Sequence, residues 1–140
     1  MKGPVYFQHG IIDSADCFVM NEKSRALAFL AAKNGFDVWL GNIRGNKYSR
    51  KHLTLDPDSN SKEFFNYSFV EMANFDITAM IDFIKVETKY SKVAFVGHSM
   101  GTTIMFYLSV RQPEWVEKSI SVFVALAPIT LPLHASSSLI

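Results

Sequence analysis

A serine flanked by glycines, in the stretch Gly97-His98-Ser99-Met100-Gly101, is the residue best placed for nucleophilic chemistry in this sequence. The Gly-x-Ser-x-Gly pattern is weak alone, but here it follows a strand-like run and precedes a helix-like run. A turn made in so few residues strains the backbone and holds the serine side chain clear of a sheet. Gly97 and Gly101 leave room where a Cβ would collide with neighbouring elements. We predict that Ser99 is a nucleophile; the alternative is a plain strand-to-helix turn.

An oxyanion forms when a serine attacks an ester, and it needs preorganised hydrogen-bond donors. One predicted donor is the backbone N–H of Met100, because the amide after the nucleophile lies at the positive end of the next helix. The second predicted donor is the backbone N–H of Ile11, which follows the first apolar segment. Gly10 permits a close backbone approach there. The alternative is that His9 and Gly10 form an ordinary turn at the end of a strand.

Four apolar, β-prone segments can bring these residues together. They are Pro4–Gln8, Phe36–Leu40, Lys92–Val96 and Ile120–Leu126. Helix-like segments alternate with them, which predicts a mostly parallel sheet of about four strands with helices on both faces. Open parallel sheets bind ligands at the carboxyl ends of their strands. The predicted oxyanion loop and the predicted nucleophile both follow such ends.

Three helices are predicted from caps and periodicity. The first takes Asn21 as its N-cap and ends at Gly35. The second begins with a capping box, in which Ser68 and Glu71 each satisfy a free backbone amide. The third covers Thr102–Arg111. The second helix is expected to place one apolar face on the sheet: Phe69, Met72, Ala73, Ile77, Met80, Ile81 and Ile84.

The composition is that of a globular chain of one domain. Hydrophobic residues make up 49% of the 140 residues and charged residues 19%, which argues against disorder. The net charge of +1, without a basic run, argues against nucleic acid as a partner. A lone cysteine, Cys17, excludes an internal disulfide and a cysteine-based metal cluster. No metal or other cofactor, no membrane span and no signal peptide are expected in this chain.

Several stretches resemble the acid lipase family of α/β-hydrolases, which includes the gastric and lysosomal acid lipases. The similarity extends from about Pro4 to Pro128 and is most specific in the loop after the second strand. The stretches that carry it are His9–Asp16, Asp37–Asn46 with Tyr48–His52, Phe69–Ala73 with Asp76, Ile81–Ile84, the elbow around Ser99, and Ala125–Pro128.

The resemblance implies a lipase that hydrolyses neutral lipid esters, such as triacylglycerols or cholesteryl esters, through a serine acyl-enzyme. It implies secretion or a lysosomal location for the full-length protein, and contact with a lipid droplet or membrane surface. Gly97, His98, Gly101, His9 and Gly10 are then expected to support the elbow and the oxyanion loop. Met100 departs from the glutamine common in the family, but only its backbone amide is needed.

Other polar residues are assigned to structure. Asn42, Arg44 and Asn46 are predicted to organise the long loop of residues 41–58. His52 and His98 are not expected to act as the base, since the first resembles a loop residue of the family and the second stands within the elbow. Asn66-Tyr67-Ser68 is a glycosylation sequon whose serine is also the predicted helix cap.

The rest of a catalytic triad is not evident. In this fold an acid and then a histidine follow the serine, but no aspartate follows Ser99. Glu114 and Glu117 come too early, and His134 lies where the family enters its cap. Residues 1–140 are therefore expected to be a partial hydrolase domain that lacks the early strands, the cap and the C-terminal triad region. The alternatives are a non-catalytic module or pseudoenzyme that binds lipid or a partner and, more weakly, another serine hydrolase such as a thioesterase.

Overall fold

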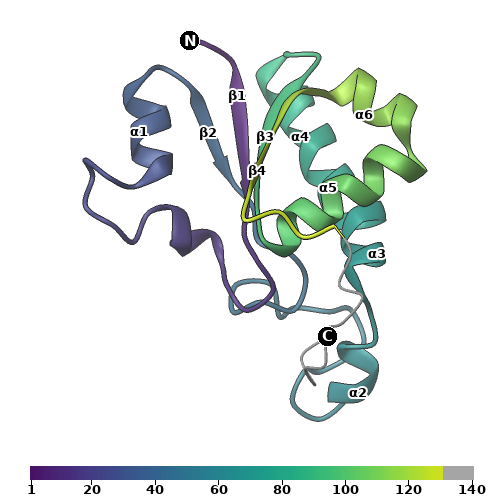
Figure 1. The fold of residues 1–140 in the computed structure, drawn as a ribbon. Helices are drawn as coiled ribbons and strands as arrows, with labels where there is room; N and C mark the ends of the chain where they lie inside the picture. The colour runs from purple at the N-terminus through teal and green to yellow at the C-terminus, as the bar shows by residue number, and fades with distance from the viewer. Residues whose placement is uncertain (131–140) are drawn as a thin grey trace.

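A computed structural model describes residues 1–130 and shows one parallel sheet with the strand order β2-β1-β3-β4 (Figure 1). The strands are β1 (Pro4–Gln8), β2 (Asp37–Leu40), β3 (Val93–His98) and β4 (Ile120–Leu126). All three strand pairings are parallel. The predicted sheet is therefore confirmed. The third strand reaches His98, two residues beyond its predicted end, because Gly97 and His98 pair with β4.

The main helices lie on both faces of this sheet, as predicted. Figure 1 shows α1 (Leu27–Lys33) on one side, and α4 (Thr78–Thr88), α5 (Met100–Arg111) and α6 (Pro113–Ser119) on the other. Short helical segments precede them in the loops: η1 (Ala15–Phe18), α2 (Ser61–Phe64) and α3 (Phe69–Glu71). The segment η2 (Met72–Ile77) is a π-helix that joins α3 to α4. No helix in residues 1–130 is both long and apolar enough to cross a membrane.

Two helix boundaries differ from the prediction. Asn21 is not an N-cap, because the backbone amides of Arg25 and Ala26 bond to the carbonyl of Glu22 and form a turn before α1. The helix after Ser99 begins at Met100 and not at Thr102. In contrast, the capping box is confirmed, since Ser68 Oγ accepts from the Val70 amide and Glu71 accepts from the Ser68 amide.

The side chains of β1 alternate between two apolar layers. Tyr6 points toward α4 and packs against Phe95 of β3, with ring centroids 5.5 Å apart. Val5 and Phe7 point to the other face, toward Phe18 and the α1 side. The predicted helical face is buried at Met72, Ala73, Ile77, Ile81 and Ile84. Phe69 differs: it lies in the first turn of this region, contacts the ring of Tyr107, and remains 37% exposed.

The α1 face of β4 is only partly covered. Val122 and Val124 are 51% and 41% exposed, although both are apolar strand residues. They line a groove of about 470 Å³ together with Val5, Phe7 and residues of α1. Within residues 1–130, this part of the sheet therefore presents an open apolar surface.

Candidate active site

Ser99 occupies a strained turn between β3 and α5. Its φ is 53° and its ψ is −119°, a backbone region that residues other than glycine seldom adopt. Its amide donates to the carbonyl of Leu126 over 3.0 Å. Its own carbonyl accepts from the Thr102 amide (2.8 Å) and the Thr102 hydroxyl (2.6 Å). Bonds to β4 and α5 thus hold the serine in this conformation.

The two glycines of the elbow allow close backbone packing. A Cβ at Gly97 would lie 2.9 Å from the carbonyl of Gly101 and 3.0 Å from the amide of Thr102. A Cβ at Gly101 would lie only 2.6 Å from the carbonyl oxygen of Gln8. These distances are shorter than side-chain contacts allow, so the start of α5 sits directly against the end of β1.

Gly10, after β1, touches the elbow. A Cβ at Gly10 would lie 3.1 Å from Ser99 Cβ, 3.5 Å from Ser99 Oγ and 3.5 Å from His98 Nδ1. His98 Nδ1 is buried and has no hydrogen-bond partner within residues 1–130. The structure therefore brings together the predicted oxyanion loop, the predicted nucleophile and the histidine beside it.

The backbone amides of Ile11 and Met100 make no hydrogen bond to any residue in the 1–130 range. Met100 opens α5, where helix amides lack intrahelical partners and the dipole is positive. Ile11 lies in the loop after β1, and 50% of its surface is exposed. Both amides thus lack a partner among these residues, as the donors of an oxyanion hole must before substrate binds.

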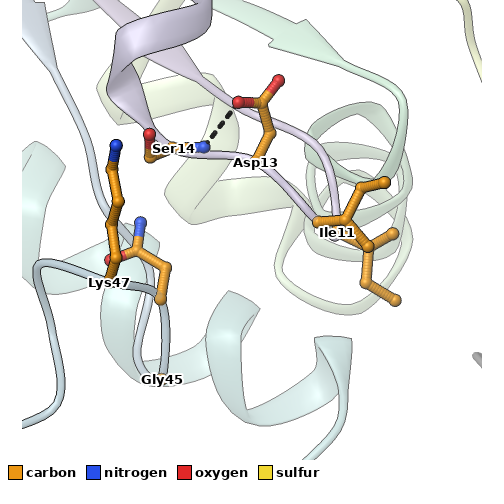
Figure 2. Close-up of a pocket in the computed structure, with 7 residues that line it drawn as sticks. Ile11, Asp13, Ser14, Gly45 and Lys47 are labelled. Carbon is orange, nitrogen blue, oxygen red and sulfur yellow. Dashed lines mark hydrogen bonds between the residues drawn. The ribbon is translucent and has the colours of Figure 1, made fainter.

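The loop after β1 also lines a pocket of about 370 Å³ (Figure 2). Figure 2 shows Ile11 at one end of this pocket and Lys47 at the other. The amide of Ser14 donates to Asp13 Oδ1 over 2.8 Å, a hydrogen bond between adjacent residues of this loop. The lining residues are Ile11, Ile12, Asp13, Ser14, Gly45, Asn46 and Lys47, and Ser99 is not among them. The pocket therefore lies between the loop after β1 and the loop after β2, apart from Ser99.

His9 connects the loop after β1, the predicted oxyanion loop, to the long loop after β2. Its side chain is fully buried, and burial lowers its pKa. Nδ1 lies 2.7 Å from the carbonyl oxygen of Gly10, whereas Nε2 lies 3.1 Å from Asn46 Nδ2 and 3.4 Å from the amide of Ile43. Asn46 Nδ2 also donates to Asn42 Oδ1 over 2.6 Å. Sequence reasoning assigned organising roles to Asn42 and Asn46 but missed their link to His9.

Arg44 anchors the same long loop to the η2 segment. Its amide and its Nε donate to the carboxylate of Asp76 over 2.9 Å and 2.8 Å. The side-chain hydrogen bonds to Asp76 raise the pKa of Arg44. Tyr67 adds a bond from its hydroxyl to the Arg44 carbonyl over 3.0 Å. The guanidinium is therefore occupied in fixing the loop, which agrees with the organising role predicted for it.

The other candidate side chains lie apart from the elbow or outside the described residues. His52 is exposed, and its Nδ1 accepts from the amides of Thr54 and Leu55 (3.2 and 3.0 Å), as a loop-forming residue does. Glu114 and Glu117 are exposed on α6. His134 lies outside the described residues. Among residues 1–130, Ser99 makes no hydrogen bond to a histidine that is in turn bonded to a carboxylate.

The sequon residue Asn66 is exposed. The hydroxyl of Ser68 is engaged in the capping box, where it donates to Glu71 over 2.8 Å. Glycosylation at this position stays a prediction.

A strained serine between a parallel strand and a helix is consistent with what comparison with known protein families finds. Residues 3–138 match the model of the alpha/beta hydrolase fold. The chain therefore belongs to the alpha/beta hydrolase fold family.

Its relatives define the group more closely. The chain is 46% identical to lipase member K of Homo sapiens over 136 residues, which are 97% of this chain and 33% of that protein. It is 43% identical to human lipase member J over 136 residues, 97% of this chain and 36% of that protein. It is 46% identical to gastric triacylglycerol lipase of Rattus norvegicus over 135 residues, 96% of this chain and 33% of that protein.

These similarities confirm the predicted resemblance to the gastric-type lipases over nearly the whole chain. The chain spans about a third of the length of the relatives that it matches.

Proposed function

We propose that the protein containing this chain is a lipase that hydrolyses neutral lipid esters, such as triacylglycerols or cholesteryl esters, with Ser99 as its nucleophile. The observation that carries the proposal is the strained backbone of Ser99, with φ of 53°, at the junction of β3 and α5. Strain of this kind collects at functional sites, and this strand–turn–helix context is that of a nucleophile elbow. The names of the relatives, which include gastric triacylglycerol lipase, support the substrate class.

In the proposed mechanism, Ser99 Oγ attacks the ester carbonyl carbon and transfers its proton to a base. The carbonyl oxygen becomes an oxyanion, which accepts hydrogen bonds from the amides of Ile11 and Met100. Collapse of this intermediate breaks the bond to the alcohol, which leaves with a proton and gives an acyl-enzyme. Water then hydrolyses the acyl-enzyme in the same manner. The base and its acidic partner are proposed to lie outside residues 1–130.

The substrate partner in this proposal is a hydrophobic ester at a lipid droplet or membrane surface. Two apolar side chains beside the proposed oxyanion amide support this: Ile11 is 50% exposed and Ile12 is 84% exposed. Secretion or a lysosomal location is proposed for the whole protein on the basis of its resemblance to the acid lipases. No cofactor and no nucleic acid take part in the proposed reaction.

The test is Ser99→Ala in the whole protein, with a triacylglycerol emulsion as substrate. Turnover should fall by about 10⁴-fold or more, because loss of a triad nucleophile removes nearly all covalent catalysis. A fluorophosphonate probe should label the wild type and not the variant. The matched control is Ser109→Ala, since the Ser109 hydroxyl only bonds to the Met105 carbonyl within α5. Hydrolysis that survives Ser99→Ala would disprove the mechanism.

The second candidate function is a catalytically incomplete protein that binds lipid or a partner. The partly uncovered apolar groove along Val122 and Val124 of β4 favours it. Fluorophosphonate labelling separates the two candidates. A folded protein whose Ser99 resists the probe supports binding without catalysis, whereas specific labelling supports the lipase.

A further inference from the structure

We infer that His9 is a positioning residue of the oxyanion site, in which a neutral imidazole protonated on Nδ1 holds the peptide plane between Gly10 and Ile11. This inference rests on the proposed function, because it takes the Ile11 amide as an oxyanion donor. The His9 side chain is fully buried, and both of its ring nitrogens lie within hydrogen-bond distance of a polar group.

The direction of each hydrogen bond follows from backbone amides, which can only donate. The amide of Ala15 donates to Asn42 over 3.0 Å, so that atom of Asn42 is its oxygen, Oδ1. The amide of Tyr48 donates to Asn46 over 3.0 Å, so that atom of Asn46 is also its oxygen. The other atom of the Asn46 side-chain amide is therefore the nitrogen, Nδ2, which has two hydrogens to donate.

Those two hydrogens determine the tautomer of His9. One hydrogen of Asn46 Nδ2 is directed to Asn42 Oδ1 (2.6 Å) and the other to His9 Nε2 (3.1 Å). The amide of Ile43 also points to His9 Nε2, over 3.4 Å. Because Nε2 faces two donors, it must be an acceptor. A neutral imidazole with an unprotonated Nε2 carries its hydrogen on Nδ1.

The hydrogen on Nδ1 is donated to the carbonyl of Gly10, 2.7 Å away. The peptide between Gly10 and Ile11 is planar and trans, with its carbonyl and its N–H on opposite sides. Fixing the Gly10 carbonyl therefore also fixes the direction of the Ile11 N–H. The other donor to this carbonyl, the amide of Asp13, is farther away at 3.4 Å. His9 thus makes the shorter of the two bonds that orient the proposed donor.

Gly10 has no side chain, and one added there would crowd Ser99, so the adjacent His9 is the residue whose side chain bonds to the Gly10 carbonyl. Burial keeps His9 neutral by lowering its pKa, since a charged imidazole loses its hydration. Through Asn46 and Asn42, the same ring ties the oxyanion loop to the loop after β2. One histidine therefore connects the donor peptide to the hydrogen bonds of Asn46 and Asn42.

Two isosteric variants of the whole protein test this role. His9→Asn places an amide nitrogen near the position of Nδ1, whereas His9→Gln reaches toward the position of Nε2. We expect kcat of His9→Gln to fall by about 10²-fold or more with little change in KM, as when an oxyanion donor is lost. His9→Asn should recover at least about tenfold of that loss. Circular dichroism and urea unfolding should show that both variants fold.

A second measurement does not depend on activity. Histidine labelled with ¹⁵N in the wild type should show His9 as the neutral Nδ1–H tautomer by long-range nitrogen–proton correlation. A His9 protonated on Nε2 would overturn the inference, and so would equal losses of kcat in the two folded variants. Failure of the proposed function is recognised separately, as hydrolysis that survives Ser99→Ala. That result would remove the oxyanion role of His9 even if its tautomer were as expected.

Discussion

Gly10 lies directly beside Ser99: a Cβ added at Gly10 would be 3.1 Å from Ser99 Cβ and 3.5 Å from Ser99 Oγ. The two residues are far apart in the sequence, and parallel pairing between β1 and β3 brings them together, with Gln8 opposite Gly97. The proposed nucleophile and the loop with a proposed oxyanion donor therefore share one end of the sheet. A methyl group at Gly10 would be crowded, because its Cβ would approach Ser99 Cβ more closely than is usual for side-chain contacts.

Gly10→Ala should impair the reaction of Ser99 more than it impairs folding. The added methyl group would press on Ser99 Cβ and shift the serine or the loop by a few tenths of an ångström. Misplacement of reacting groups costs rate steeply, so fluorophosphonate labelling should slow by about tenfold to a hundredfold. The rate is measured by quenched labelling of the whole protein. Gly35→Ala is a control for stability, since a Cβ there meets no atom within 4 Å although its φ is +87°.

An unchanged labelling rate in a folded Gly10→Ala variant would contradict this prediction. It would mean that the loop moves away from Ser99 without consequence for the proposed chemistry.

Asp76→Asn should destabilise the loop after β2. The carboxylate accepts from the amide and the guanidinium of Arg44, and its side chain is only 12% exposed. Hydrogen bonds to charged groups contribute about 1.5–3 kcal/mol, and partial exposure of Arg44 reduces this, so a loss of about 1–2 kcal/mol is expected. Asp58→Asn is the matched control. Its ion pair with Arg50 lies at the surface, with Asp58 85% exposed, and should contribute less than about 1 kcal/mol.

The measurement is the free energy of unfolding in urea for both variants. Equal losses in Asp76→Asn and Asp58→Asn would show that burial of the Arg44 pair does not strengthen it.

The buried His9 should make stability depend on pH in the weakly acidic range. Burial lowers the pKa of His9 below its ordinary value of 6.5. Below pH 6.5 the unfolded chain therefore takes up a proton at this residue that the folded chain does not. The free energy of unfolding should decrease as the pH falls from 6.5 toward the lowered pKa, by at most about 1.4 kcal/mol per pH unit for one proton. Above pH 6.5 this contribution to stability is fully present.

Urea unfolding at several pH values between 7.5 and 5.5 measures this dependence. The carboxylates with lowered pKa, among them Asp16 and Glu71, lose their stabilising effect only at more acidic pH. His9→Asn should flatten the dependence within the window, because asparagine does not titrate. Wild type and variant with the same slope would contradict a neutral, buried His9.

Local patterns in the sequence determined most of the elements. The four strands were predictable because each is a short apolar run bounded by turn residues, and the capping box of Ser68 and Glu71 was predictable because its partners are three residues apart. The same local logic was wrong at Asn21, where a turn from Glu22 replaces the expected helix start. It also missed α6, which follows the predicted end of the third helix at Arg111 and begins at Pro113, a residue well suited to the first turn of a helix.

The sequence by itself determined that Ser99 lies between a strand and a helix, because the apolar run before the glycine-flanked serine and the helix-like run after it are both local patterns. Only the tertiary structure decided which groups surround it. Gly10 meets Ser99 through strand pairing, and His9 meets Asn46 through a contact between residues 37 positions apart. Such contacts depend on the order of strands in the sheet and on the path of a long loop. No local periodicity encodes them, and for that reason the tautomer and role inferred for His9 required the folded chain.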